Sequence, residues 1–594
     1  MTYLVRLLRP FVLLASSLVS FCSLRAADPA FLQWAPRPPM GWNSWDCFGT
    51  TVTEDQVKAQ AGFMATQLKA HGWEYIVIDI QWYEPGATGH DYRAGAPLTM
   101  DAYGRLQPAP NKFPSAAAGA GFKPLADHIH ALGLKLGLHL MRGIPRNAVA
   151  ANLPVFGTAF HAQDIANPAS ICPWNPDMYG VDLTKPGAQA YYDSVFALFA
   201  SWGVDYVKVD DISRPYHQNE KEIEAIRAAI DHSGRPIVLS LSPGETALTA
   251  ADHVGRHANL WRISDDFWDR WLALHDQFAR LWNWNDHRRP GAWPDADMLP
   301  LGRLNLGERA TRFTPDEQRT MLSLWSIARS PLMHGGDLTQ TDAPTLALLT
   351  NDEVLAVNQQ SANNRPLFNH DDLIAWTADV PGSPDKYLAV FNARDRVRLT
   401  PETARAAALG AKGQPVPIDA DIHGGTRLFL AALPADPSGE WNHILWREPR
   451  LVLADGTERP LTELKWTKAD SCWDGTKVKK DSTGTAGIAA QIPAVVEFAL
   501  PAGAVRFKAT GLIEGNGRGT APGPVHFLVA VATAPDDLPA PGLAVEVTLA
   551  DLGISGAVKV RDLWTHTEAG QVTGKFAPVI PWHGAGLYRL NPMK

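Results

Sequence analysis

The sequence predicts an α/β protein whose first part is a (β/α)8 TIM barrel and whose second part is built of antiparallel β-sandwiches. Between about residues 38 and 349, eight short apolar runs alternate with longer helical patterns, which is typical of repeated βα units. Most of the apolar runs end in polar or charged residues, where the active sites of parallel barrels lie. Beyond Asn351, short alternating runs replace this pattern and indicate an antiparallel sandwich.

The predicted barrel strands cover residues 40–45, 75–82, 135–140, 206–210, 236–242, 258–264, 292–298 and 332–337. Helical patterns between them include residues 55–70, 121–132, 187–201, 219–232 and 315–328. Eight such units over about 310 residues match the size of a (β/α)8 barrel. A doubly wound open sheet is the alternative fold, but no Gly-x-Gly-x-x-Gly follows the first strand, so a dinucleotide site is not supported.

Composition bounds the classes of function. A chain of 594 residues is too long for a single core, so two or three domains are expected. The net charge of -8 is mild and no basic stripe is present, so nucleic acid is an unexpected partner. The sequence contains no His-Glu-x-x-His or other metal-ligand motif, and we expect neither metal nor cofactor.

Residues 1–27 are typical of a signal peptide. Arg6 and Arg9 precede an apolar run, and small residues at Ala26 and Ala27 provide a cleavage site. The mature chain is therefore expected to be secreted or periplasmic, with no membrane span after signal removal. Three cysteines would remain, namely Cys47, Cys172 and Cys472. They allow one disulfide, and the sequence does not decide whether Cys47 and Cys172 pair.

The apolar run 204–209 ends in charge and supplies the first candidate for chemistry, Asp210. Lys208 lies two residues earlier and therefore on the same face of the strand, where it favours an ionised Asp210. Other strand ends contribute polar groups in the same way. These are Trp45, Asp79, His139, Ser242, Arg262, Asp265, Asp266, Trp293, Asp295 and Asp297. A ring of carboxylates with interleaved tryptophan predicts a glycoside hydrolase, which needs one carboxylate beside the anomeric carbon and a second carboxyl group to protonate the leaving oxygen.

Five segments carry a resemblance to a known family. They are Pro-Pro-Met-Gly-Trp-Asn-Ser-Trp at 38–45, Val-Ile-Asp at 77–79, Gly-Leu-Lys-Leu-Gly at 133–137, Trp-Gly-Val-Asp-Tyr-Val-Lys-Val-Asp at 202–210, and Pro-Asp-Ala-Asp-Met-Leu at 294–299. In this order they resemble glycoside hydrolase family 27, the melibiase or α-galactosidase family. The family also holds α-N-acetylgalactosaminidases, isomaltodextranases and β-L-arabinopyranosidases.

The resemblance implies a role for each matching residue. Asp210 resembles the nucleophile that forms a covalent glycosyl-enzyme, and Asp266 resembles the general acid/base. Asp265 is the rival for the second role, because a one-residue slip would exchange the two. The implied sugar-binding groups are the hydrogen-bonding Asp79 and Lys208, the 2-position ligand Arg262, and the pocket walls Trp45 and Trp293. Asp297 is expected to support its loop.

Four positions depart from the family pattern. In α-galactosidases the second strand ends in two aspartates that bind the 4- and 6-hydroxyl side of the sugar, whereas here the second residue is Ile80. A sugar without a hydroxymethyl group, such as β-L-arabinopyranose, suits an apolar residue there. Ser242 stands where galactosidases carry a glutamate, and a serine resembles the α-N-acetylgalactosaminidases. His139 replaces a common tyrosine, and like Ile80 and Ser242 it is expected to contact the sugar. Ile212 replaces the cysteine that usually pairs with Cys172.

The resemblance thus implies a retaining exo-glycosidase that acts on oligosaccharide or polysaccharide side chains with terminal α-D-galactosyl residues. The alternatives are a β-L-arabinopyranosidase or another family 27 specificity, an inverting mechanism, and a non-catalytic carbohydrate-binding protein.

The expected domains are a signal peptide at 1–27, a catalytic barrel at 28–350, and a C-terminal sandwich at 351–395 and 539–594. The late Asp-Leu-Trp at 562–564 and His-Gly at 583–584 resemble the family's C-terminal domain. Residues 396–538 are expected to form an inserted sandwich, which resembles the NPCBM-like carbohydrate-binding module found beside secreted glycosidases. A spacer without a ligand is the alternative for this insert.

Overall fold

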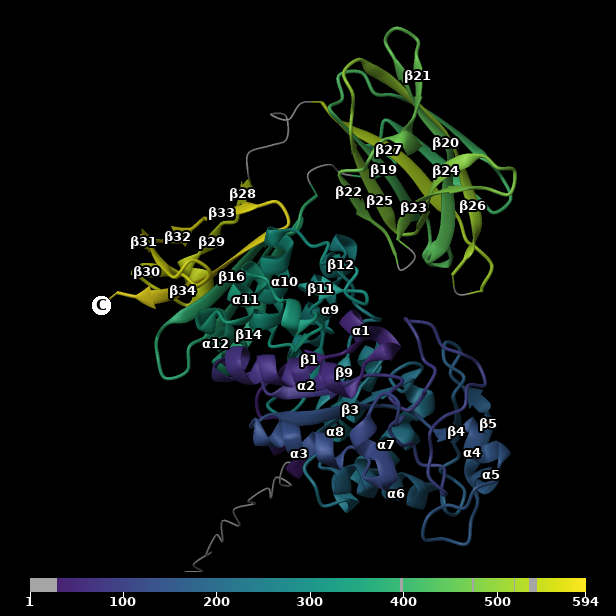
Figure 1. Ribbon diagram of the computed structural model, residues 1–594. Coiled ribbons are helices and arrows are strands. Elements are labelled where there is room, and N and C mark those ends of the chain that lie inside the picture. The colour runs from purple at the N-terminus through teal and green to yellow at the C-terminus, as the bar shows by residue number, and fades with distance from the viewer. Residues whose placement is uncertain (1–28, 396–398, 473–474, 518, 534–541, 594) are drawn as a thin grey trace, which may run out of the picture.

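The computed structural model describes residues 29–395, 399–472, 475–517, 519–533 and 542–593 (Figure 1). Eight strands form one sheet in the order β10-β9-β8-β7-β3-β2-β1-β13, and every pairing in it is parallel. A parallel bridge between Leu299 and His334 joins the two outer strands and closes the barrel. The predicted barrel is confirmed, and the open-sheet alternative is wrong.

All eight predicted barrel strands are present, most of them shorter than predicted. They are β1 (Met40–Asn43), β2 (Tyr75–Ile78), β3 (Lys135–Met141), β7 (Tyr206–Asp210), β8 (Val238–Leu241), β9 (Leu260–Arg262), β10 (Trp293–Asp295) and β13 (Leu332–His334). The short pairs and small sheets of the barrel loops are β4 (Ile144–Pro145), β5 (Ala166–Ile171), β6 (Met178–Val181), β11 (Arg303–Leu304) and β12 (Arg309–Ala310).

Helices connect the barrel strands and follow the last of them, and only some of them begin at a side-chain N-cap. They are α1 (Trp45–Phe48), α2 (Glu54–Phe63), α3 (Lys123–Ala131), α4 (Arg146–Ala150), α5 (Ala162–Ile165), α6 (Ala188–Trp202), α7 (Tyr216–His232), α8 (Ala251–His257), α9 (Trp271–Trp284), α10 (Pro315–Ala328), α11 (Ala343–Leu349) and α12 (Asp352–Gln360). Thr53 and Gln56 form a capping box at the start of α2. The predicted helix over 55–70 is interrupted, because α2 ends at Phe63 and continues to His71 only as short π and 3-10 turns.

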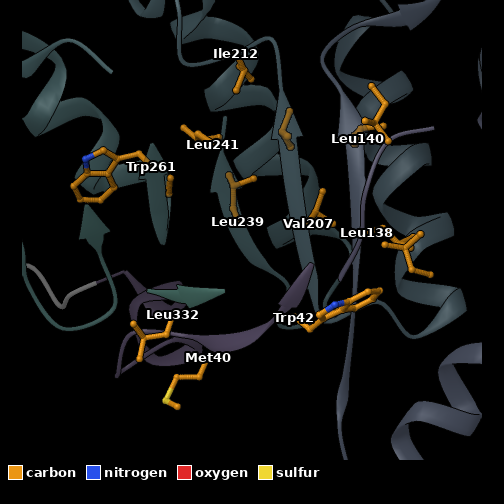
Figure 2. Close-up of a cluster of buried hydrophobic side chains, with 14 of the residues drawn as sticks. Met40, Trp42, Leu138, Leu140, Val207, Ile212, Leu239, Leu241, Trp261 and Leu332 are labelled. Carbon is orange, nitrogen blue, oxygen red and sulfur yellow. The ribbon is translucent and has the colours of Figure 1, made fainter. Parts of the chain in front are cut away.

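The period-2 alternation of each barrel strand separates the core from the site. Figure 2 shows the buried side chains of Leu138, Val207 and Leu239, which alternate along their strands with His139, Lys208 and Ser240. Burying a leucine or valine side chain of this kind stabilises a fold by about 1.5–3 kcal/mol. The outer apolar layer therefore fixes the register of the strands and, with it, the inward direction of the polar side chains.

Strands from both sides of the insert share the C-terminal sheet, whose order is β14-β15-β16-β34-β30-β31. Its strands are β14 (Ala362–His370), β15 (Leu373–Asp379), β16 (Lys386–Asn392), β30 (Ala557–Asp562), β31 (Thr567–Thr573) and β34 (Gly584–Pro592). Two small pairs accompany it, β28 (Gly542–Ala544) with β33 (Val579–Pro581), and β29 (Val547–Thr548) with β32 (Lys575–Phe576).

The segment between these halves forms two antiparallel sheets of its own, visible as a separate body in Figure 1. One holds β17 (Ala406–Gly410), β27 (Val525–Ala532), β19 (Arg427–Pro434), β25 (Ala494–Ala499) and β22 (Lys468–Asp470). The other holds β18 (Val416–Asp421), β26 (Ala504–Asn516), β20 (Asn442–Leu453), β24 (Ala486–Gln491) and β23 (Thr476–Lys480), with β21 (Glu458–Pro460) paired to β20. Trp446 packs edge-on against Phe527 at 5.1 Å inside a core separate from that of the barrel.

Glu317 on α10 connects all three parts. Its Oε1 lies 2.6 Å from Nζ of Lys468 in the insert and 2.8 Å from Nδ1 of His583 in the C-terminal sandwich. Its Oε2 accepts a hydrogen bond from the Thr314 N–H and completes the cap of α10. The side chain is 1% exposed, and these partners offset its burial and lower its pKa to about 2.

Cys47, Cys172 and Cys472 are all buried and unpaired with each other, so Cys47 and Cys172 form no disulfide. Among the described residues, no helix has the length and apolar character that a membrane crossing requires. The predicted signal peptide, residues 1–27, lies outside the described residues.

Candidate active site

The carboxyl ends of the barrel strands open into a cavity of about 1030 Å³. Six of the predicted site residues line it, among them Asp79 and Ile80 after β2, Lys208 and Asp210 on β7, and Asp266 after β9. Trp45 at the start of α1 also lines it. This is the end of a (β/α)8 barrel at which catalytic groups lie.

Lys208 lies between two buried carboxylates. Its Nζ is 2.9 Å from Oδ2 of Asp79 and 3.6 Å from Oδ2 of Asp210. The Asn43 side-chain amide also donates to Asp79 Oδ2, at 2.7 Å, and the Ile80 N–H donates to its Oδ1 at 2.8 Å. The sequence places Lys208 and Asp210 on one strand face, and the pairing of β7 through β3 with β2 brings in Asp79.

His139 and Ser242 lie beside Asp210 and do not line the cavity. Nε2 of His139 is 2.9 Å from Asp210 Oδ2, and Ser242 also hydrogen-bonds this carboxylate. His139 is fully buried and Ser242 is 1% exposed. The sequence predicted both as sugar ligands; in the structure they orient the carboxylate that faces the cavity.

The charges of this cluster hold both carboxylates ionised. Burial alone would raise the pKa of Asp210, but the Lys208 ammonium and the hydrogen bond with His139 outweigh it and keep that pKa well below its usual range. The same balance of burial against Lys208 lowers the pKa of Asp79. Burial opposes the charge on Lys208, but Asp210 and Asp79 raise its pKa overall. The cluster therefore presents an anionic oxygen of Asp210 over the entire neutral range.

The pKa of Asp266 is shifted in the opposite direction from that of Asp210. Burial, together with the nearby charges of Asp265 and Asp297, raises its pKa to about 7, although Arg262 opposes the shift. Nη2 of Arg262 is 3.2 Å from Asp266 Oδ1 and only 2.7 Å from Asp297 Oδ2, so Arg262 is shared between the two carboxylates. Asp266 is therefore half protonated near neutral pH.

The neighbouring Asp265 is held differently. Its Oδ2 lies 2.9 Å from Nη1 of Arg214 in a partly exposed ion pair. Its Oδ1 accepts the backbone N–H of Asp266 at 3.1 Å. Of the two adjacent carboxylates, Asp266 has the environment of a proton donor, and Asp265 has a permanent cationic partner.

The structure corrects the prediction for Trp293. The sequence predicts it as a pocket wall, but it precedes Asp295 by two residues on the inward face of β10 and therefore lies one layer deeper in the barrel. It is 1% exposed, and its Nε1 donates to Ala35 O at 2.8 Å. It closes the amino-terminal end of the barrel. Asp297 supports the neighbouring loop after β9 rather than its own, because its Oδ2 accepts the Phe267 N–H at 2.7 Å.

The sequence missed much of the cavity wall. Tyr92 stacks on Trp45, with ring centroids 6.1 Å apart and planes 3° from parallel, and Trp174 packs on Tyr92 at 5.5 Å. Trp268 follows Asp266 in the loop after β9. The aromatic residues of these loops were the available signal, but loop residues have no periodicity that would place them.

Two carboxylates of opposite protonation behaviour, in an aromatic-lined pocket with a lysine, have the groups that glycosidic bond cleavage requires. The fold and the site together define a glycoside hydrolase. Both carboxyl groups are present, so the alternative of a binding protein that has lost its chemistry is not supported.

Comparison with known proteins also indicates a glycoside hydrolase. A family model described as alpha galactosidase A matches residues 179–360, and one described as the alpha galactosidase C-terminal beta sandwich domain matches residues 527–590. The α-galactosidase of Cyamopsis tetragonoloba is 30% identical over 61% of this chain and 74% of its own length. Alpha-galactosidase A of Cellvibrio japonicus is 31% identical over 59% of this chain and 75% of its own. The chain belongs to glycoside hydrolase family 27, the melibiase or α-galactosidase family.

A solved structure matches nearly the whole chain, including the insert. The family 27 β-L-arabinopyranosidase of Geobacillus stearothermophilus is 40% identical, with a TM-score of 0.69, and the match covers 96% of this chain and 99% of that one. A variant of that protein has been solved in complex with arabinose.

Proposed function

We propose that this enzyme is a β-L-arabinopyranosidase, which removes terminal β-L-arabinopyranosyl residues with retention of configuration. The observation that carries the proposal is Ile80. It lines the cavity directly after Asp79, is 1% exposed, and presents an apolar side chain where a hydrogen-bonding acceptor for a hydroxymethyl group would be needed. The 40% identity to an arabinopyranosidase over nearly the whole chain supports the same choice.

A hydroxyl group without a hydrogen-bond partner would distinguish the two sugars. D-Galactose and L-arabinopyranose share the arrangement of ring hydroxyls, but galactose carries an additional hydroxymethyl group. Leaving that hydroxyl without a partner against Ile80 would cost about 1–3 kcal/mol. Arabinopyranose has no such group to desolvate, so the apolar wall discriminates in its favour.

The proposed mechanism is double displacement. Asp210 attacks the anomeric carbon and forms a glycosyl-enzyme ester, while Asp266 donates its proton to the departing glycosidic oxygen. Asp266 then removes a proton from water, which attacks the anomeric carbon and releases Asp210. Lys208 and Asp79 hold ring hydroxyls, and His139 orients the attacking carboxylate.

The test is parallel hydrolysis of p-nitrophenyl β-L-arabinopyranoside and p-nitrophenyl α-D-galactopyranoside by the mature enzyme. We expect kcat/KM to favour the arabinoside. A strong preference for the galactoside would contradict the proposal and favour α-galactosidase, the second candidate, which the curated relatives support. Export of the mature enzyme to the periplasm or the medium is part of the proposal and is tested by fractionating cells.

Substitution of Ile80 by aspartate is expected to shift specificity toward the galactoside. The new carboxylate can accept a hydrogen bond from the hydroxymethyl group, so the galactoside-to-arabinoside ratio of kcat/KM should rise by about tenfold or more. Ile80→Ala is the control, because it removes the apolar wall without adding an acceptor. An equal change in both variants, or an unchanged ratio, would show that Ile80 does not set specificity.

The pH profile should show a basic limb near pH 7. Asp266 must be protonated to act as acid, and its pKa is raised to about 7, so kcat/KM is expected to fall as pH rises through that value. The pKa of Asp210 lies well below its usual range, so this carboxylate stays ionised in weak acid and should not limit the rate there. Initial rates from pH 4 to 9 (about 0.5-unit steps) measure this. A flat profile up to pH 9 would contradict the assignment of Asp266.

A further inference from the structure

We propose that the inserted sandwich builds the leaving-group subsite of this active site, and that this subsite binds the neutral sugar residue to which the terminal sugar is attached. The inference rests on the proposed exo-glycosidase function and adds to it a role for a domain outside the barrel. It makes the insert part of the catalytic pocket.

The cavity extends from the barrel carboxylates to the insert. Besides the strand-end residues, six insert residues line it, namely Trp441, His443, Cys472, Gly475, Gln491 and Gly517, here called the insert face. Barrel-loop residues of the outer wall include Trp268, Arg270 and Arg309. At about 1030 Å³, the cavity is slightly larger than the range of about 300–1,000 Å³ that is typical of sites for drug-sized ligands. A single sugar at Asp210 therefore leaves the outer part of the cavity for a second residue.

Buried polar contacts fix the insert face against the barrel. Nη1 of Arg270 lies 3.1 Å from Sγ of Cys472, and the backbone N–H of Leu272 donates to Oδ2 of Asp470 at 3.2 Å. Asp470 is buried, and burial raises its pKa. These contacts lie at the start of α9, directly after the loop that carries Asp266, so the insert is anchored beside the proposed acid.

The insert face is itself held together by backbone hydrogen bonds between its loops. The Gly517 N–H donates to Trp441 O at 2.9 Å, and the Cys472 N–H donates to Gln491 O at 2.9 Å. Trp441 has a φ of 67°, a backbone conformation that is costly for a bulky residue and persists only where the surrounding structure holds it. The tryptophan is therefore presented to the cavity from a fixed backbone.

The residues of the outer cavity suit a neutral sugar. Trp441 and Trp268 offer aromatic faces for the C–H side of a pyranose ring, while Gln491 and His443 offer donors and acceptors for hydroxyls. The guanidinium of Arg309 is neutralised by Asp269, at 2.5 and 2.9 Å, so this part of the wall adds hydrogen-bonding groups rather than net charge.

The test compares two leaving groups on the same terminal sugar. For the wild type, Trp441→Ala and Gln491→Ala, kcat/KM is measured with a glycosyl fluoride, whose fluoride is too small to reach the insert, and with a disaccharide. The fluoride and the disaccharide are each prepared with a terminal β-L-arabinopyranosyl group and with a terminal α-D-galactosyl group. The two leaving groups are then compared for the terminal sugar that the wild type hydrolyses faster. Trp466→Ala is the control, because Trp466 packs against the core of the insert and does not line the cavity.

We expect Trp441→Ala to lower kcat/KM for the disaccharide by about tenfold and to change that for the fluoride by less than about twofold. Trp466→Ala should leave kcat/KM unchanged for both the disaccharide and the fluoride. Equal losses on both substrates, or no loss on the disaccharide, would overturn the inference. A wild type that prefers the galactosyl series would refute the proposed specificity and leave this comparison intact. Calorimetric titration of Asp210→Asn, with and without Trp441→Ala, by the disaccharide gives an independent readout, and equal affinities would also overturn it.

Discussion

Replacing Asp210 by asparagine is expected to abolish turnover while leaving the fold intact. The amide has nearly the same shape but cannot form the glycosyl-enzyme ester, and loss of a nucleophile of this kind costs about 10⁴-fold or more in kcat. The Asp210 side chain is close to His139 and Lys208, so some loss of stability is expected as well. The measurements are kcat on the p-nitrophenyl glycoside and the melting temperature by circular dichroism.

Asp91 provides a matched control for that substitution. It is an exposed carboxylate that lines the same cavity but lies outside the strand-end cluster. Asp91→Asn should retain kcat within about threefold, because it removes a similar charge without touching the ester-forming oxygen. Near-normal turnover by Asp210→Asn would remove Asp210 from the nucleophile role. For the wild type, proton NMR of the first sugar released distinguishes retention from inversion, and an inverted anomer would refute double displacement.

Replacing Asp266 by asparagine is expected to give the second largest loss. General acid catalysis contributes about 10²–10⁴-fold, and its loss should fall mainly on substrates with poor leaving groups. The kcat/KM of an alkyl glycoside or disaccharide should therefore drop far more than that of the glycosyl fluoride. The basic limb near pH 7 should disappear at the same time, because no group with a pKa raised in this way remains at that position.

Asp265→Asn discriminates between the two adjacent carboxylates. Asp265 is paired with Arg214 and faces the cavity mouth, so its substitution should change kcat/KM by a few-fold and preserve the basic limb. If Asp265→Asn instead removed the limb and Asp266→Asn kept it, the assignments would have to be exchanged.

The sequence predicts the barrel well because its signal is local. Runs such as 206–210 end an apolar stretch with charge, and parallel pairing necessarily gathers those ends at one side of the sheet. Asp79, Lys208 and Asp210 meet for this reason. The prediction for Trp293 was wrong because the sequence does not show how far a strand residue lies from the open end of the barrel. Two residues along a strand shift a side chain by about 6.6 Å.

The remaining part of the site depends on long-range packing that no local pattern encodes. The pKa of Asp266 depends on burial and on the charges of Arg262 and Asp297, which only the folded barrel brings together. Trp441 reaches the cavity from the insert, about 230 residues downstream of Asp210, through the docking of two separately cored domains. The local pattern at 441–443 gives no indication of a catalytic neighbour.

The shared position of Glu317 has a consequence for how the chain loses its structure. Separating either sandwich from the barrel would remove one of the two partners of this nearly inaccessible carboxylate, so the three parts are expected to melt in one cooperative transition near neutral pH. Its pKa falls from 4.5 to about 2 on folding, which corresponds to stabilisation on the order of 3 kcal/mol. That contribution is complete above about pH 4.5 and is lost as pH falls toward 2, so acid is expected to weaken the attachment of both sandwiches to the barrel.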